Sequence, residues 1–289
     1  MQFQRIKTEV LVNLSLAGRL MMPEQTKYDV IGKDYNETRR PDKRIVNLLV
    51  ECLDLPPGSN VIDIGAGTGN YTKTIAELGH FVTAVEPSAT MISKACRHKN
   101  IEWKKSEAEN IPLSDTTFDG AYCTLSMHHF ANLEKSLTEI FRVLKPEGKF
   151  VAFTADPRRS AEGFWMPQYF GPIYDRITKI FPTTQQLVDK IKIVSKNNSI
   201  EITPFPIPYD IEDGFYCSSW RYPEKYLNPT FRQGISHFQL ADQADVQEML
   251  KSLRQDIDSG VWDKNYGDTR SRNLLECGYY FVSATKHCH

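Results

Sequence analysis

The sequence has little of what marks a membrane, disulfide-rich or nucleic-acid-binding protein. Its 289 residues carry 35 Lys and Arg against 36 Asp and Glu, a net charge of −1, so no basic field favours a nucleic acid partner. No apolar run approaches the length of a membrane span, which argues against a membrane partner. The six cysteines are scattered without a C-x-x-C pair, which argues against a structural metal site or a disulfide framework and favours a reducing, cytoplasmic location.

A short apolar run, in contrast, breaks abruptly into a glycine turn. Val61, Ile62 and Ile64 are typical of a buried strand, and residues 71–78 have helical composition. An open parallel sheet presents bare backbone to a ligand in this way, at the carboxyl end of a strand. A dinucleotide fingerprint requires a third glycine where Asn70 stands, which argues against a nicotinamide dehydrogenase.

The turn carries the motif Asp63-x-Gly65-x-Gly67-Thr68-Gly69, with an acid inside the strand. An acid at this place suits a cationic ligand with an amino acid moiety better than it suits a pyrophosphate. The motif resembles motif I of the class I S-adenosylmethionine-dependent methyltransferases, and the resemblance extends in five ordered motifs over residues 28–154. It implies that S-adenosyl-L-methionine is the cofactor, that S-adenosyl-L-homocysteine is its product, and that Asp63, Gly65, Gly67 and Thr68 contact it.

Further cofactor contacts follow from the resemblance. Glu86 ends the next predicted strand, where a carboxylate accepts both ribose hydroxyls. Pro87 follows it, and Met91 would cover one face of the adenine. The stretch 106–113 resembles the family's D-A-E-x-L-P-F sequence: Glu107, in place of the usual Asp, would take the adenine amino group, and the backbone N–H of Ala108 would meet a ring nitrogen.

The segment before the sheet adds two contacts. In the resembling enzymes such a segment folds over the cofactor, and a Tyr and an Arg touch it; Tyr35 and Arg40 occupy the corresponding positions. The alternative is that Tyr35 only packs and that Arg40 is a solvated charge.

The fourth strand leads into a histidine pair. By resemblance, Leu125 and Met127 would line the methionine moiety. His128 and His129 are the catalytic candidates, because an imidazole can remove a proton near pH 7. The alternative is a buried histidine that anchors the loop by a hydrogen bond, particularly for His129.

The predicted fold is α/β: a Rossmann-like three-layer sandwich whose seven-stranded, mostly parallel sheet carries an antiparallel edge hairpin, with a mainly helical lid. The strands after the first two are expected at 101–105, 117–124, 149–154, 200–207 and 278–284, and helices at 133–144, 183–194 and 241–259. We divide the chain into an N-terminal extension (1–27), a cofactor-binding core (28–155), a substrate lid (156–182 and 208–275) and the C-terminal part of the sheet (183–207 and 276–289).

The two lid segments are rich in aromatic residues, which favours an apolar or aromatic small molecule as substrate. The alternative is that these rings pack the lid on the sheet. The sequence therefore predicts a methyltransferase that transfers a methyl group in line to O, N or C of a small molecule, without a metal; the oligomeric state stays open. A non-catalytic regulatory or partner protein that binds S-adenosylmethionine is the alternative. Arsenite methylation is disfavoured because the cysteines show no convergent arrangement.

Overall fold

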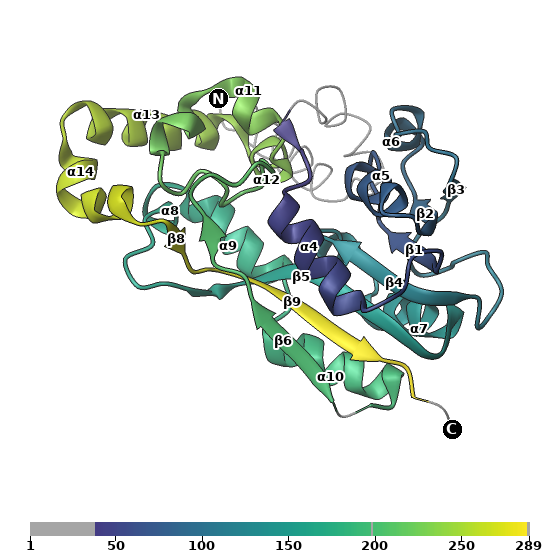
Figure 1. Ribbon diagram of the computed structural model, residues 1–289. Helices are drawn as coiled ribbons and strands as arrows, with labels where there is room; N and C mark the ends of the chain where they lie inside the picture. The colour runs from purple at the N-terminus through teal and green to yellow at the C-terminus, as the bar shows by residue number, and fades with distance from the viewer. Residues whose placement is uncertain (1–37, 198, 288–289) are drawn as a thin grey trace, which may run out of the picture.

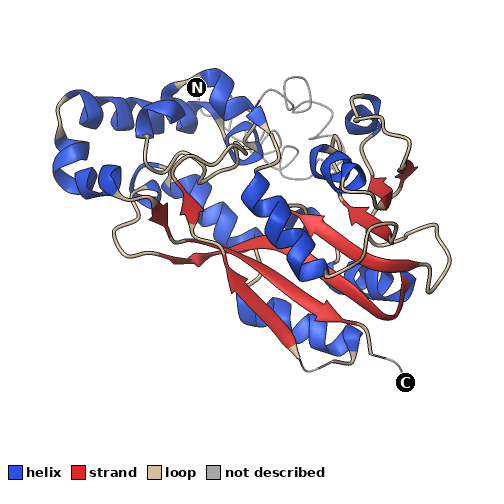
Figure 2. Ribbon diagram, viewed as in Figure 1, coloured by secondary structure: helices blue, strands red, loops and turns tan. Residues whose placement is uncertain are grey.

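The computed structural model describes residues 38–197 and 199–287, and a seven-stranded sheet organises them (Figures 1 and 2). The strand order is β3-β2-β1-β4-β5-β9-β6. The strands are β1 Asn60–Ile64, β2 Phe81–Glu86, β3 Ile101–Lys105, β4 Phe118–Thr124, β5 Leu144–Ser160, β6 Ile200–Pro204 and β9 Cys277–Thr285. The strands from β3 to β5 are parallel, and β9 is antiparallel to both β5 and β6. This confirms the predicted sheet and its antiparallel edge.

The strand order reverses next to β1, and this reversal locates the ligand crevice. The chain runs outward from β1 through β2 to β3 and then returns to the other side of β1 as β4. Open α/β sheets bind ligands outside the carboxyl ends of their strands at such a switch point. The fold therefore places a crevice at the ends of β1, β2 and β4.

Helices cover both faces of the sheet. They are α4 Lys43–Leu53, α5 Asn70–Glu77, α6 Ala89–Ser93, α7 Leu133–Val143 and α10 Thr184–Ser195. Ile45 of α4 and Ile75 of α5 belong to one buried cluster, and Leu137 of α7 and Leu187 of α10 belong to a second. Since each helix buries one apolar stripe against the sheet, the result is the predicted three-layer sandwich.

Polar side chains cap the starts of three helices. The side chain of Asp42 accepts a hydrogen bond from the Arg44 backbone N–H at 2.9 Å, and Asn132 caps α7 in the same way. At α10, Thr183 and Gln186 form the complete capping box, with distances of 3.1 and 2.9 Å. Each cap satisfies backbone donors that the first helical turn leaves open.

A mainly helical region lies beside the sheet, at the upper left of Figure 1. Its elements are α8 Met166–Tyr169, α9 Gly171–Ile180, η2 Pro223–Leu227, α11 Pro229–Gln233, α12 Ser236–Gln239, α13 Gln243–Asp258, α14 Val261–Tyr266 and η3 Gly267–Ser271, together with the strand pair β7 Ile207–Pro208 and β8 Leu274–Leu275. From α8 onward these elements occupy the segments assigned to the lid; their role as a lid stays a prediction. The N-terminal extension lies outside the described residues.

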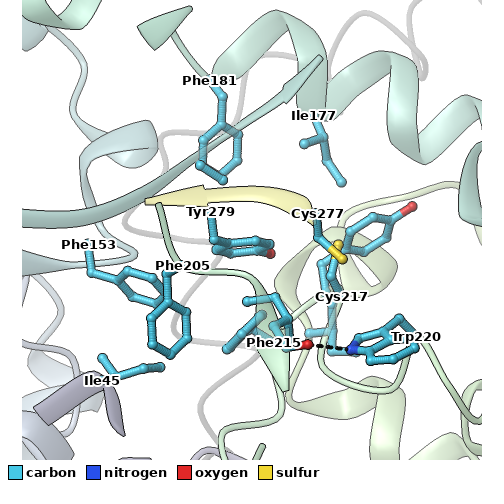
Figure 3. Packing of buried hydrophobic residues seen from close by; sticks show 14 of the residues in the cluster. Ile45, Phe153, Ile177, Phe181, Phe205, Phe215, Cys217, Trp220, Cys277 and Tyr279 are labelled. Carbon is cyan, nitrogen blue, oxygen red and sulfur yellow. Dashed lines mark hydrogen bonds between the residues drawn. The ribbon is translucent and has the colours of Figure 1, made fainter. Parts of the chain in front are cut away.

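Most aromatic side chains of this region are core residues. Trp165, Phe170, Trp220 and Tyr226 are fully buried, and the Trp165 indole N–H donates to the Trp220 carbonyl at 2.7 Å. Figure 3 shows part of the cluster, in which rings of the sheet and of the helical region lie together. For these rings the alternative interpretation holds: they pack the helical region onto the sheet.

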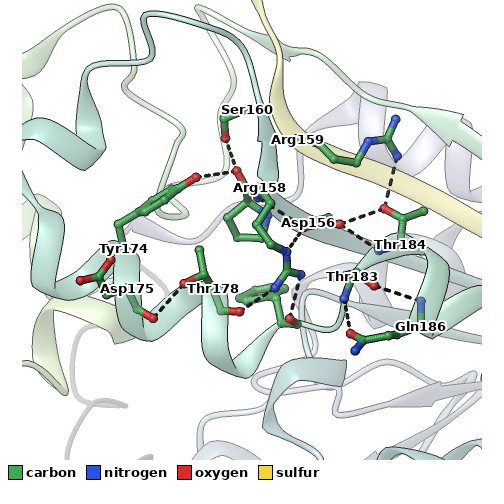
Figure 4. Close-up of polar contacts among 12 residues, drawn as sticks. Asp156, Arg158, Arg159, Ser160, Tyr174, Asp175, Thr178, Thr183, Thr184 and Gln186 are labelled. Carbon is green, nitrogen blue, oxygen red and sulfur yellow. Dashed lines mark hydrogen bonds and ion pairs between the residues drawn. The ribbon is translucent and has the colours of Figure 1, made fainter.

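The fifth strand is longer than predicted. It continues to Ser160, beyond the expected end at 154, and its register with β9 shifts between Ala155 and Ser160. At the shift, the Asp156 carboxylate accepts hydrogen bonds from the Arg158 side chain at 2.7 Å and from the Thr184 backbone at 2.9 Å (Figure 4). This carboxylate therefore ties the end of β5 to the start of α10.

Gly278 of β9 faces the same irregularity, and its replacement tests how tightly the two strands approach. Its φ is +79°, and a Cβ there would lie 2.1 Å from the Asp156 carbonyl oxygen. Gly163 has a similar φ of +75° but open space around it. We expect Gly163→Ala to lower the free energy of unfolding by about 1 kcal/mol through backbone strain alone. Gly278→Ala should lower it by roughly 3 kcal/mol or more, because backbone must also move.

Urea denaturation followed by circular dichroism measures both variants. Equal destabilisation by the two substitutions would contradict a close contact between Gly278 and the β5 backbone.

Candidate functional site

A cavity of about 560 Å³ lies at the strand-order reversal, within the size range of small-molecule sites. Most residues predicted from the sequence line it: Arg40, Asp63, Gly65, Gly67, Thr68, Glu86, Pro87, Met91, Glu107, Ala108, Leu125, His128 and His129. Tyr35 lies outside the described residues. Met127 does not line the cavity.

The glycine turn and the loop after β4 form one closely packed wall of this cavity. Gly65 has a φ of +72°, and a Cβ there would lie 2.6 Å from the Ser126 Cβ. The Ser126 hydroxyl donates to the Ile64 carbonyl at 2.8 Å, which fixes this approach. Any side chain at position 65 would separate the two segments, so glycine is required for conformation and for space.

Glu86 ends β2 and is held by backbone donors. Its two carboxylate oxygens accept hydrogen bonds from the backbone N–H groups of Gly67 and Ser88, each at 2.9 Å. Burial raises the pKa of Glu86, and these two hydrogen bonds oppose the rise. A carboxylate has about four acceptor positions. Glu86 therefore keeps capacity to accept from two neighbouring hydroxyls of a ligand.

Asp63 lies deeper in the same wall and is only 2% exposed. The Thr72 hydroxyl donates to it at 2.6 Å. Burial nevertheless raises the pKa of Asp63 to about 7, and the nearby Glu86 adds to the rise. A ligand cation beside Asp63 would restore its ionised form. The site therefore fits the amino group that the sequence motif predicts.

The exit of β4 is conformationally strained. Leu125 adopts a left-handed backbone with φ +51°, which costs a non-glycine residue roughly 1–2 kcal/mol. It turns the chain into the short helix η1 Met127–His129. Met127, predicted to line the methionine end of the ligand, lies instead in the buried cluster with α7 and α10. The side chain of Met127 is therefore part of the core, and its contact with the methionine end stays a prediction.

The histidine pair faces the cavity among other rings. The ring of His128 stacks on Phe181 with centroids 4.1 Å apart, and it lies 3.9 Å from His129 and 5.7 Å from His237. Burial lowers the pKa of His128 well below its ordinary value, and the positive charges that His129, His237 and Arg39 can carry add to this effect. The residue is partly exposed, but its Nδ1 is buried and finds no hydrogen-bond partner among the described residues. His128 is therefore neutral near pH 7, and no hydrogen bond through its Nδ1 anchors the loop.

Further residues that line the cavity were not predicted from the sequence, among them Arg39, Asn70, Tyr71 and Asp213. Arg39 donates two hydrogen bonds to Asp213, the longer at 3.2 Å, and the Tyr71 hydroxyl donates to the same carboxylate at 3.0 Å. Asn70 donates to the Arg39 carbonyl at 2.7 Å. This group, which we call the Asp213 clamp (Arg39, Tyr71 and Asp213), joins the segment before α4, helix α5 and the loop after β7. Its members are 142 and 174 positions apart in the chain, and no local pattern links them.

Comparison with known proteins identifies the class. Residues 62–152 match the family model described as a methyltransferase domain. The demethylmenaquinone methyltransferase of Tropheryma whipplei (strain Twist) is 31% identical over 183 residues, which cover 60% of this chain and 76% of that protein. A putative methyltransferase from an antibiotic biosynthesis pathway of Anabaena variabilis is 38% identical over 86% of this chain and 99% of that one, with a TM-score of 0.82. The chain belongs to the class I S-adenosylmethionine-dependent methyltransferases.

Other relatives match over a smaller part of their length or with lower sequence identity. The chain spans about half the length of the demethylmenaquinone methyltransferases of Corynebacterium kroppenstedtii and Corynebacterium urealyticum, 55% and 56%, at 33% and 32% identity. The [4+2]-cyclase SpnF shares the fold, with a TM-score of 0.56 and 18% identity over 91% of this chain and 94% of that one.

Within 38–197 and 199–287, no helix is both long and apolar enough to cross a membrane.

The buried acid Asp63 makes stability depend on pH. Its pKa is about 7 in the folded protein, against 3.8 for an aspartate in water. The unfolded chain therefore releases this proton at lower pH, so ionisation of Asp63 costs the folded state stability as the pH rises from about 4 to 7. In Asp63→Asn, where the neutral amide still accepts from Thr72, we expect the free energy of unfolding relative to the wild type to rise across that window by roughly 2–4 kcal/mol.

Urea denaturation of both proteins without ligand, at pH 5, 6, 7 and 8, measures this difference. A constant difference across the series would mean that Asp63 does not titrate in the folded protein as its burial requires.

Proposed function

We propose that the chain is an S-adenosylmethionine-dependent methyltransferase that acts on a small, apolar or aromatic molecule and methylates O, N or C. One observation carries the proposal: the glycine turn, the carboxylate of Glu86 and the pair His128-His129 line a single cavity. Hydrogen-bond acceptors for a ribose and a candidate proton acceptor thus occur within the reach of one ligand.

The cofactor contacts are proposed residue by residue. Glu86 accepts hydrogen bonds from the ribose, and Asp63 faces the amino group. Met91 covers the adenine, Glu107 accepts from its amino group, and the Ala108 backbone donates to the ring. Arg40 closes the cavity from the segment before α4, and we keep Tyr35 as a contact from the part of the chain outside the described residues.

Bound S-adenosylmethionine supplies an electrophilic methyl group on its sulfonium. The protein's contribution is to hold the acceptor in line with this group and to exclude water, which is catalysis by proximity and orientation. Leu125 and Thr124, whose hydroxyl has no hydrogen-bond partner within 38–197 and 199–287, line the cavity at the exit of β4, where we place the reacting atoms. An acceptor that carries a proton loses it as the new bond forms, and we assign its removal to His129, with neutral His128 beside it.

Several observations support the proposed substrate class and location. The relatives include proteins named demethylmenaquinone methyltransferase and sterol methyltransferase-like 1, whose named substrates are small and largely apolar. The helical region, proposed as the lid, contributes Asp213 to the cavity wall. Five cysteines among the described residues are free thiols, which supports a cytoplasmic location. We propose no nucleic acid or membrane partner.

A non-catalytic protein that binds S-adenosylmethionine is the second candidate. The strained backbone at the end of β4 argues against this second candidate. A protein that only binds the cofactor does not need a strained cavity wall beside the proposed site of the methyl acceptor. Formation of S-adenosylhomocysteine from S-adenosylmethionine in the presence of a panel of phenols, amines and carboxylates distinguishes the two functions.

The role of Glu86 is tested by Glu86→Gln, which keeps the shape of the side chain but removes its charge. We expect binding of S-adenosylmethionine to weaken by about tenfold or more, because hydrogen bonds to a charged acceptor are worth about 1.5–3 kcal/mol. Isothermal titration calorimetry measures the affinity. Glu77→Gln is the matched control, since Glu77 is exposed on the nearby helix α5.

If Glu86→Gln binds S-adenosylmethionine as tightly as the control variant does, Glu86 does not bind the ribose. Failure of the wild-type protein to bind S-adenosylmethionine would overturn the proposed function itself.

A further inference from the structure

A second, small chamber lies beyond the histidine pair. Its volume is about 40 Å³, which is room for a small polar group, because a single water occupies about 10–15 Å³ on the same measure. Arg39, Leu125, His128 and His129 line both this chamber and the larger cavity, so the two adjoin. The chamber's far side is formed by the helical region, through Tyr216 and His237.

Three residues that line the chamber carry polar atoms without a hydrogen-bond partner among the described residues. The Tyr216 hydroxyl and the His237 Nδ1 are buried and have no hydrogen-bond partner among the described residues; the two side chains belong to residues that are 5% and 7% exposed. His128 Nδ1, at the near side, has none either. Buried polar groups are nearly always paired in folded proteins. Three partnerless atoms around one chamber therefore point to a ligand that supplies the missing hydrogen bonds.

The charges around the chamber select the kind of ligand. Arg39 is already paired with Asp213 of the adjoining cavity, and no Asp or Glu is among the described residues that line the chamber. Burial lowers the pKa of His237 to about 3, and nearby His129, Arg176 and Arg39 add to this effect, so His237 is neutral near pH 7. Neutral imidazole and phenol groups hydrogen-bond a hydroxyl or carbonyl group, but they cannot compensate a buried ammonium.

The walls are flat rings. Phe181 stacks on His128 with an interplanar angle of 21°, and Tyr216 meets His237 edge to face, with centroids 5.8 Å apart. Phe215 and Tyr279 complete the aromatic lining. The described residues hold no group of three side chains arranged to bind a metal ion, which excludes these three histidines as such a site. A planar organic group fits these surroundings.

We propose that Tyr216 and His237 are specificity-determining residues that bind the hydroxyl or carbonyl group of an uncharged, planar methyl acceptor, and that the chamber rejects ammonium acceptors. This inference rests on the proposed function and narrows its substrate class. It assigns the acceptor's polar end to the helical region and its methylated atom to the exit of β4, where the two cavities meet.

The test compares two aromatic probes of similar size, the uncharged 2-naphthol and the cationic 1-naphthylmethylammonium ion. Binding of each to the full chain, saturated with S-adenosylhomocysteine, is measured by saturation-transfer NMR titration. We expect 2-naphthol to bind at least about tenfold more tightly than the cation, because a buried ammonium would find no counter-charge. Tyr216→Phe and His237→Phe should each weaken 2-naphthol binding by about fivefold, the effect of one hydrogen bond.

Tyr209→Phe is the control for the loss of a tyrosine hydroxyl, because Tyr209 lies outside the chamber under the guanidinium of Arg221. Calorimetry with S-adenosylhomocysteine shows whether each variant keeps its cofactor site; Tyr216→Phe changes a single atom and serves should His237→Phe fail to fold. Equal binding of the two probes, or no effect of Tyr216→Phe on 2-naphthol, overturns this inference while the proposed function stands. A wild-type chain that does not bind S-adenosylhomocysteine overturns the proposed function.

Discussion

Two carboxylates buried in the wall of one cavity, Asp63 and Glu86, are the constraint on which the site depends. Removing an ionised carboxylate from water costs several kcal/mol unless a positive charge is paired with it. Among the described residues both acids receive hydrogen bonds only from hydroxyl or backbone groups, and neither forms an ion pair. The packed sheet must therefore supply the stability that these acids remove. A ligand that brings an amino group and a pair of hydroxyls to these acids would return part of this stability on binding, as the proposed cofactor contacts require.

The position of these acids follows from topology. Each stands on a parallel strand that ends at the same edge of the sheet, beside the place where the strand order reverses. Two local distortions complete the wall: Gly65, where no side chain fits, and Leu125, which keeps a left-handed backbone despite its side chain. Strain of this kind persists only where the surroundings determine the backbone, and here the Ser126 hydroxyl and the pairing of Leu125 with Phe153 do so. Rigid strands thus support a turn whose shape serves the ligand.

Local sequence signals predicted the strands and several helices, because apolar periodicity and turn residues act over a few residues. The resemblance to the methyltransferase family predicted thirteen residues that line the cavity. Neither predicted the Asp213 clamp, since Asp213 meets Arg39 across 174 positions of the chain, nor His237, which lies in a segment without a motif. The burial of Met127 in the core was not predicted either, because family motifs specify the order of residues and not the direction of a side chain within a tight turn. The end of β5 was set too early for a similar reason: its continuation depends on pairing with β9, which is a non-local interaction.

The aromatic composition of the helical region also shows how a correct observation can support too broad a conclusion. The many aromatic residues of the two segments assigned to the lid suggested an apolar or aromatic substrate, yet Trp165, Phe170, Trp220 and Tyr226 are core residues that would be buried whatever the substrate. Rings that pack a lid carry no information about an acceptor. The informative groups are the few buried polar atoms that find no hydrogen-bond partner in the described part of the chain, because satisfying them is unnecessary for folding and their presence costs stability. Substrate preference in this chain is therefore better inferred from Tyr216 and His237 than from the number of rings around them.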